Sequence, residues 1–397
     1  MAFLLGAIAF VVALLVSVML HEAGHLLTAK RFGMKATQFF VGFGPTLWSR
    51  RVGETEYGVK ALPLGGFVRI VGYTPLEPVP AADRPRAFYR QPASRRVVVI
   101  AAGVVANFVF AFVLLMVLAM AVGVRQPGTA TTTVAHVSAC VPAALRQPCG
   151  PGRPPSPAAA AGLRPGDRVV SYNGTPVSDW ARLRTAIGES RPGQAVPVVV
   201  RRGDAQMTVS LRPAQVEGRP FVGVSARVVG QDYRRTGPLG AAGFAVAGIG
   251  QTLAGIGQVV VDLPAAIPKL FSPERASTPG GQVGSVVGAT DISGQIFSAH
   301  ASWRDKIALF LSLVVSLNIF LGALNVLPLL PLDGGHLAVV GYERARARVA
   351  RARGRPDPGT VDMTKLLPVT YLAVMLLVGL GLLLILADLV NPLRLPR

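Results

Sequence analysis

Residues 21–25 read His-Glu-Ala-Gly-His, a spacing that can build a metal site on one face of a helix. Positions i and i+4 of a helix lie on the same face, so His21 and His25 can hold one metal ion. Glu22 follows the first histidine, where it can take a proton from water at the metal. The pattern therefore predicts two zinc ligands and a catalytic base.

This motif follows a stretch that is apolar enough to lie inside a membrane. Residues 1–20 contain no charged side chain, and a charged group at the centre of a membrane helix costs about 2.5–3.5 kcal/mol. Ionisable residues in such a place are functional candidates by default. A cleaved signal peptide is the alternative, but no basic start and no small-residue cleavage site precede the histidines.

A zinc ion held by two histidines usually needs a third protein ligand, with water in the fourth position. Residues 325–335 read Asn-Val-Leu-Pro-Leu-Leu-Pro-Leu-Asp-Gly-Gly, and Asp333 is the only carboxylate between Lys306 and Glu343. The two prolines before Asp333 break a helix, and the two glycines after it let the backbone turn. We expect Asp333 to point into the helix bundle as the third ligand. The alternative is an ordinary turn at a helix end.

The composition indicates a membrane protein, because 51% of the 397 residues are hydrophobic. Four blocks lack Asp, Glu, Lys and Arg and reach the roughly 20 residues that a spanning helix needs, namely 1–20, 97–124, 307–332 and 366–387. We therefore predict four transmembrane helices, within residues 1–31, 97–124, 304–335 and 366–390.

The net charge of +20 indicates a membrane surface rather than nucleic acid. Residues 31–96 hold eleven Lys and Arg against four Asp and Glu, and residues 344–355 hold six arginines. Short loops rich in Lys and Arg stay in the cytoplasm, which places both termini outside the cell membrane. No aromatic-basic nucleic-acid motif is present. His21, His25 and Asp333 then lie at the same depth, toward the cytoplasm.

The remaining segments have different characters. Residues 32–96 hold apolar runs split by glycines, which indicates a cytoplasmic, membrane-associated β region and a connector. Residues 126–230 read as strands and tight turns of an α+β domain outside the membrane. Residues 231–303 indicate an amphipathic or interfacial segment, because a fifth span would reverse the last two helices. Residues 336–365 form an Arg-rich cytoplasmic loop.

The cysteines and the other histidines leave alternatives open. Cys140 and Cys149 lie in the external segment, where a disulfide is permitted, but two unpaired thiols fit the sequence equally well. His136 and His300 read as surface residues. His336, just after Asp-Gly-Gly, is a candidate partner of a metal ligand.

Taken together, the two motifs in their spans resemble the site-2 protease family of intramembrane zinc metalloproteases, in its bacterial branch with a single PDZ domain. Residues 42–45 (Gly-Phe-Gly-Pro), 162–167 and 285–288 fit the same family. The resemblance covers nearly the whole chain. It implies a polytopic α-helical membrane protein with four transmembrane helices, a membrane-associated β-hairpin region and an inserted extracytoplasmic PDZ-like α+β domain.

The resemblance also implies roles for single residues. His21, His25 and Asp333 would bind Zn²⁺, and Glu22 would be the general base and acid. No departure from the family pattern is visible at these positions.

A substrate site is implied as well. Asn325 would contact the substrate backbone, unless it merely caps a broken helix. Gly42, Phe43 and Gly44 belong to a region, residues 37–70, that would pair as a β-hairpin with an unwinding substrate. The alternative is a hairpin that only anchors the loop in the membrane interface.

The implied substrates are single-span membrane proteins already trimmed outside by an upstream site-1 protease. Anti-sigma factors are the usual class, and remnant signal peptides are another. The PDZ-like domain would filter substrates by size or bind the new C-terminus of the trimmed substrate, unless it is a structural cap.

The main alternative function is a non-catalytic PDZ-bearing membrane scaffold, which predicts loss of Glu22 or Asp333. A metal transporter is a further alternative, but it needs polar residues along a whole path, and the second and fourth spans have almost none. A zinc peptidase for soluble peptides needs an open site rather than one surrounded by apolar helices.

Overall fold

The computed structural model describes residues 1–73, 78–143, 149–150, 152–273 and 275–394. The chain divides into two compact units. The helical unit comprises Met1–Gly123 and Arg235–Arg397, and the inserted unit comprises Val124–Arg234.

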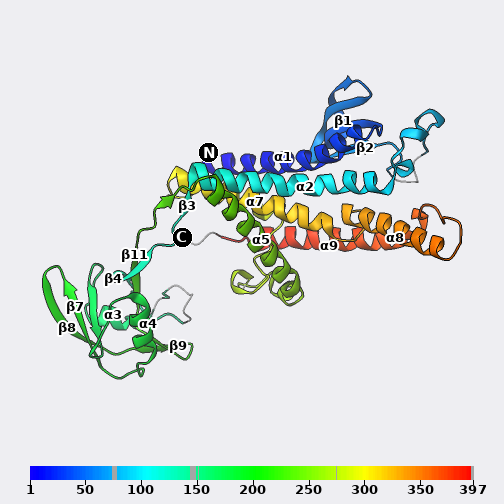
Figure 1. Ribbon diagram of the computed structural model, residues 1–397. Helices are drawn as coiled ribbons and strands as arrows, with labels where there is room; N and C mark the ends of the chain where they lie inside the picture. The colour runs from blue at the N-terminus through cyan, green and yellow to red at the C-terminus, as the bar shows by residue number, and fades with distance from the viewer. Residues whose placement is uncertain (74–77, 144–148, 151, 274, 395–397) are drawn as a thin grey trace. The chain divides into compact units, whose positions relative to one another are not determined.

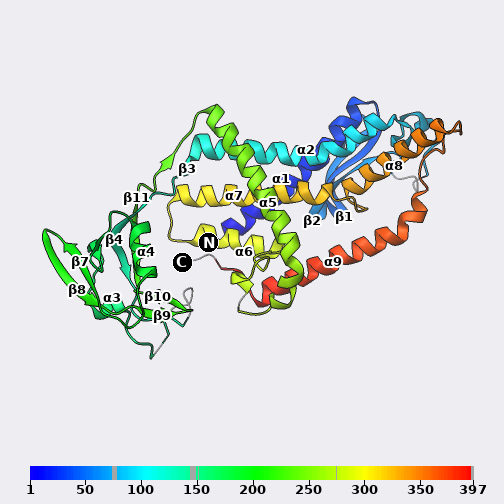
Figure 2. The same cartoon turned by 60° about the horizontal axis from the view of Figure 1, so that its bottom comes forward.

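Long apolar helices dominate the helical unit because its sequence holds long charge-free blocks. Its helices are α1 (Ala2–Arg31), α2 (Ala93–Val117, continued by the π-turn Leu118–Val122), α5 (Pro238–Ala266), α6 (Val286–Ser298), α7 (Trp303–Val326), α8 (Asp333–Ala352) and α9 (Leu367–Val390). The 3₁₀ turns Ala81–Arg86, Phe88–Arg90, Ile267–Lys269, Arg275–Ser277 and Met363–Leu366 connect them. In Figures 1 and 2, α1, α2 and α7 lie side by side and α5 runs obliquely across them.

Five helices of the described residues are long and apolar enough to cross a membrane, judged by length and composition. They are Ala2–Arg31, Ala93–Val122, Pro238–Lys269, Trp303–Val326 and Thr364–Val390. The third lies in the segment that the sequence indicates to be interfacial. Length and composition alone therefore do not separate an interfacial helix from a span here.

Small and polar residues join the helices around the metal-binding motif. A Cβ atom on Gly24 of α1 would collide with the Ala102 carbonyl of α2, so glycine lets the two helices approach closely. The Asn318 amide of α7 donates to the Ser17 hydroxyl of α1 at 2.9 Å, and both residues are fully buried. Such contacts are typical of helices that pack within a membrane.

The sheet of the helical unit consists of β1 (Ala36–Val52) and β2 (Thr55–Ile70). These long strands bend, so that residues 38–41 pair on one side with 66–69 and on the other with 56–59. Residues 66–69 therefore form one outer strand of the sheet. Gly42 and Gly44, both at φ 85°, lie where β1 leaves this double pairing. A positive φ of this size favours glycine.

Helix α8 departs from two sequence expectations. The arginine-rich segment expected as a loop is helical up to Ala352. Gly334 and Gly335 do not turn the backbone, since neither takes a positive φ. Glycine is needed instead because a Cβ on Gly334 would collide with the Val326 and Leu327 carbonyls. The first turn of α8 thus packs directly on the end of α7.

The inserted unit is an α+β domain with its own core. Its main sheet has the order β11 (Val224–Val229), β4 (Thr129–Val137), β5 (Arg168–Tyr172), β7 (Val196–Arg202) and β8 (Ala205–Leu211), and β6 (Thr175–Pro176) pairs with β5. The short strands β9 (Ala214–Val216) and β10 (Arg219–Phe221) pair together, as do β3 (Val124–Arg125) and β12 (Tyr233–Arg234). Helices α3 (Pro157–Ala160) and α4 (Trp180–Gly188) complete it. Its buried core includes Val134, Leu163, Val169, Tyr172, Leu183, Val198 and Val200.

Two features fasten the loops of this unit. Cys140 and Cys149 form a disulfide, which decides between the two alternatives left by the sequence. The Asp167 carboxylate, 1% exposed, accepts hydrogen bonds from the Arg164 backbone N–H and, through both oxygens, from the Arg202 guanidinium. These bonds to Arg202 lower the pKa of Asp167 below its usual value.

We expect Asp167→Asn to destabilise the inserted unit by about 1.5–3 kcal/mol at neutral pH, the value of hydrogen bonds to a charged group. Because the pKa is lower in the folded than in the unfolded state, the stabilisation is present above about pH 4. It is lost as the pH falls through the folded-state value. Thermal unfolding of residues 124–234, followed by circular dichroism from pH 7 to pH 3, should show the two variants converging in acid. A constant difference would contradict the assignment.

Candidate metal centre

His21 and His25 of α1 and Asp333 of α8 meet at one point inside the helical unit. The two Nε2 atoms lie 3.2 Å apart, and Asp333 Oδ2 lies 3.1 Å from His21 Nε2 and 3.3 Å from His25 Nε2. All three residues are buried. The structure thus brings together residues that are more than 300 positions apart in the chain.

The arrangement suits a zinc ion. Two imidazole nitrogens and one carboxylate oxygen, with water as the fourth ligand, form a typical catalytic zinc set. Asp333 Oδ2 is buried and accepts no hydrogen bond from any residue that the structure describes. His25 Nδ1 lies 2.8 Å from the Val99 carbonyl, so this nitrogen donates its proton there and Nε2 keeps its lone pair. These donor atoms fit a bound cation better than they fit one another.

Glu22 lies between the histidines and the β1–β2 sheet. Its Oε2 accepts a hydrogen bond of 3.0 Å from the Val68 backbone N–H, and Glu22 directly follows His21 in α1. Val68 pairs with Phe39 in the sheet and belongs to the outer strand. The carboxylate is therefore held at the edge of the sheet, beside the candidate metal ligands.

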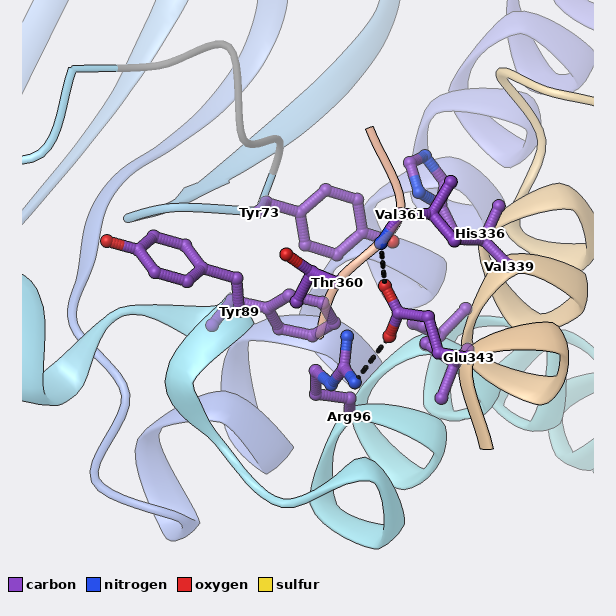
Figure 3. Close-up of a pocket in the computed structure, with 11 residues that line it drawn as sticks. Tyr73, Tyr89, Arg96, His336, Val339, Glu343, Thr360 and Val361 are labelled. Carbon is purple, nitrogen blue, oxygen red and sulfur yellow. Dashed lines mark hydrogen bonds and ion pairs between the residues drawn. The ribbon is translucent and has the colours of Figure 1, made fainter. Parts of the chain in front are cut away.

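A cavity of about 250 Å³ lies between α2, α8 and the turn after β2, and the three candidate ligands are not among the residues that line it (Figure 3). Tyr73 and His336 line it, with their rings 4.9 Å apart. Burial raises the pKa of Tyr73 well above its usual value, and the negative charges of Asp333 and Glu22 act in the same direction, so the hydroxyl stays protonated. Tyr73 is thus a neutral side chain on the cavity wall. The His336 ring, a candidate partner of a metal ligand, lies next to the Tyr73 ring.

An ion pair between α2 and α8 also lines this cavity. The Arg96 guanidinium donates to the Glu343 carboxylate at 2.7 Å, and their side chains are 11% and 9% exposed. Figure 3 shows the same carboxylate accepting from the Val361 backbone N–H, at 2.9 Å. Because α8 begins at Asp333, this pair also fixes the helix that carries the third candidate ligand.

Removing one partner of this pair should be costly, since it leaves a buried charge alone. We expect Arg96→Met or Glu343→Leu to destabilise the helical unit by about 3–5 kcal/mol, and the double variant by much less. Thermal unfolding in detergent measures this. The exposed pair of Arg86 and Glu54, with side chains 43% and 33% exposed, is the control and should cost about 1 kcal/mol at most. Equal losses at both pairs would contradict the expectation.

The residues expected to contact substrate lie in two places. Asn325 is in the last turn of α7, half-buried, and its amide donates to the Leu321 carbonyl at 3.0 Å. Phe43 is 44% exposed and its ring lies 5.9 Å from that of Phe67. Gly42 and Gly44 flank it in β1. These residues are not among those that meet at the metal-binding cluster.

Three groups around the centre escaped the sequence analysis. The Val68 N–H and the Tyr73 ring gave no sequence signal, because their positions depend on the sheet and on the turn after it. Asn107 of α2 did give one, since it is the only polar side chain among residues 97–124. It is fully buried, and its amide faces His21.

Comparison with known proteins yields a family and full-length relatives. The model of peptidase family M50 matches residues 9–356. The zinc metalloprotease Rip1 of Mycobacterium tuberculosis is 40% identical over all of both chains, and Rip1 of Mycolicibacterium smegmatis is 37% identical over 99% of both. A putative zinc metalloprotease of a Nostoc species is 30% identical over 97% of this chain and 96% of its own. The PDZ domain of an SdrC-like protein from Listeria monocytogenes matches 26% of this chain and 90% of its own, at 18% identity and a TM-score of 0.18.

Proposed function

The chain belongs to peptidase family M50, the site-2 protease family, and is a zinc metalloprotease of the multi-pass membrane type; from this premise we propose that it hydrolyses peptide bonds within or near the transmembrane segment of single-span membrane proteins. The observation that carries the proposal is the meeting of His21, His25 and Asp333 next to Glu22, among apolar helices.

His21, His25 and Asp333 would hold the zinc ion. When bound, zinc polarises the scissile carbonyl and makes water a stronger acid. Glu22 takes a proton from the attacking water and later delivers it to the leaving amine. The Val68 N–H, 3.0 Å from Oε2, orients the Glu22 carboxylate. Water would reach the site from the side that the positive-inside rule assigns to the cytoplasm.

The β1–β2 sheet would receive the unwound substrate. A helical peptide bond is shielded by its own hydrogen bonds, so the substrate must become extended, and a sheet edge can then satisfy its backbone groups. The outer strand formed by residues 66–69 suits this role, because Val68 presents its N–H at Glu22. Phe43 and Asn325 would contact the substrate farther from the zinc.

Four membrane crossings account for the helix directions. Asp333, just beyond α7, contacts histidines in the C-terminal part of α1, so α1 and α7 run in the same direction. The Arg304 side chain at the start of α7 donates to the Val122 carbonyl at the end of α2. The chain therefore leaves α2 and enters α7 on one side of the membrane, and the number of crossings between them is even.

Helix α5 would then lie against the bundle on the extracytoplasmic side. If α5 crossed, α6 would have to cross back, but its 13 residues extend only about 20 Å, less than the roughly 30 Å of a bilayer core. The segment that follows α5 also contacts the C-terminal end of α9. Leu270 packs on Leu384, and the buried Arg275 guanidinium donates to Asp388 at 2.6 Å. Both termini then lie outside.

The substrates would be proteins that an upstream site-1 protease has already trimmed. Anti-sigma factors are the expected class, and remnant signal peptides are a second. The inserted unit, as a PDZ-like domain outside the membrane, would exclude substrates that still carry a bulky external domain. The disulfide between Cys140 and Cys149 is consistent with an oxidising, extracytoplasmic location.

A pair of substrates tests this proposal. One is a single-span protein with its folded external domain, and the other is the same protein without that domain. Co-expression should give cleavage of the trimmed substrate alone, detected by immunoblot of the cytoplasmic fragment. Equal cleavage of both would remove the filter role. No cleavage of either by zinc-loaded protein, across several trimmed substrates, would favour a membrane scaffold instead.

A further inference from the structure

Helix α2 presents three positions, each four residues apart, to the two histidines of α1. The Val99 carbonyl faces His25, a Cβ on Gly103 would collide with His25 Nε2, and the Asn107 amide faces His21. Positions spaced by four residues lie on one helix face. One face of α2 therefore packs against both histidines. Helices α1 and α2 lie side by side in Figures 1 and 2.

For His25, the ring nitrogen that faces away from Asp333 already has a hydrogen-bond partner. Its Nδ1 lies 2.8 Å from the Val99 carbonyl, which can only accept. The proton is therefore on Nδ1, and the lone pair on Nε2 points toward Asp333 and His21. A metal-binding histidine usually donates its other N–H to such an acceptor, which fixes the orientation of the ring.

For His21 the corresponding contact joins two nitrogens. Its Nδ1 lies 3.4 Å from Asn107 Nδ2. If His21 binds zinc through Nε2, its Nδ1 carries a proton, and two donors then face each other. The Asn107 carbonyl oxygen, meanwhile, is buried without a hydrogen-bond partner among the described residues. The oxygen and nitrogen of an amide have nearly the same shape, and their assignment follows from the hydrogen bonds they make.

A half-turn of the Asn107 amide removes both conflicts at once. We propose that Asn107 is a positioning residue whose side-chain oxygen accepts a hydrogen bond from the His21 Nδ1–H, as the Val99 carbonyl does for His25. Helix α2 then supplies the hydrogen-bond acceptor for the Nδ1–H of both histidines and holds each Nε2 toward the zinc. This inference rests on the proposed function in one respect, that His21 is a zinc ligand.

The test is zinc affinity, measured on the purified full-length protein in detergent by competition with a chelator. Asn107→Leu removes the acceptor at similar volume. Asn318→Leu is the matched control, because Asn318 is equally buried but bonds Ser17 and the Val314 carbonyl rather than a histidine. We expect Asn107→Leu to weaken zinc binding by about 10–100-fold, and Asn318→Leu to leave it within about twofold of the original protein.

Asn107→Asp keeps an acceptor oxygen at the same place and should restore most of the zinc affinity. Unchanged affinity in Asn107→Leu, equal losses in both leucine variants, or a loss that Asn107→Asp does not repair would each overturn the inference. His21→Ala separates this outcome from failure of the proposed function. If His21→Ala binds zinc as tightly as the original protein, the ligand assignment itself is wrong.

Discussion

Replacement of Glu22 by glutamine is expected to abolish peptide-bond cleavage and to leave the protein folded and zinc-loaded. Glutamine has nearly the same shape, and its carbonyl oxygen can still accept the Val68 N–H bond that holds Glu22. It cannot take a proton from water or deliver one to the leaving amine. General acid–base catalysis contributes about 10²–10⁴-fold, so the rate should fall by at least that factor. Cleavage of a trimmed single-span substrate in membranes measures the loss.

The control for this experiment is Glu56→Gln. Glu56 lies in the same sheet, but its carboxylate bonds the Ser49 hydroxyl rather than facing the histidines. It should cleave at the original rate. Zinc content, measured by mass spectrometry of the purified variants, should be equal in all three proteins. Cleavage by Glu22→Gln at a similar rate would show that another group moves the proton.

Replacement of Asp333 by alanine is expected to abolish cleavage by a different route, through loss of zinc. Asp333 Oδ2 is the oxygen that faces both histidine nitrogens, at 3.1 and 3.3 Å. Alanine leaves two ligands, which hold zinc much less firmly than three. The affinity should fall by more than the roughly 10–100-fold typical of a lost hydrogen bond to a ligand. Chelator competition measures the affinity, and the substrate assay measures activity.

The control here is Asp357→Ala, an exposed carboxylate between α8 and α9 that caps the Gly359 backbone N–H. It should keep zinc and activity. The comparison with Glu22→Gln is informative, since both variants are expected to be inactive but only Asp333→Ala should be free of zinc. If Asp333→Ala bound zinc normally, the third ligand would have to be sought elsewhere.

The centre itself was within reach of the sequence, because its residues are constrained by chemistry. The i, i+4 histidines needed a third ligand, and Asp333 was the only carboxylate in the late apolar block. Charge-free blocks and arginine-rich loops then placed both halves at the same end of the bundle. In the structure, the three side chains meet there.

The contacts around the centre were out of reach for a physical reason. The Val68 N–H acts through backbone pairing in a strongly bent sheet, and such a register leaves no pattern in the side chains. The role of Gly334 depends on how closely α8 packs on α7, which two adjacent glycines do not reveal. Asn107 was different, since a single amide in an apolar helix is itself a signal.

The central claim, cleavage inside the membrane, is tested most directly by the masses of the products. A trimmed single-span substrate and the purified protein would be reconstituted in lipid vesicles, and both fragments weighed by mass spectrometry. We predict one cut within or next to the apolar segment of the substrate, present with the original protein and absent with Glu22→Gln. Cuts confined to the soluble parts of the substrate, or the same cut with Glu22→Gln, would contradict it.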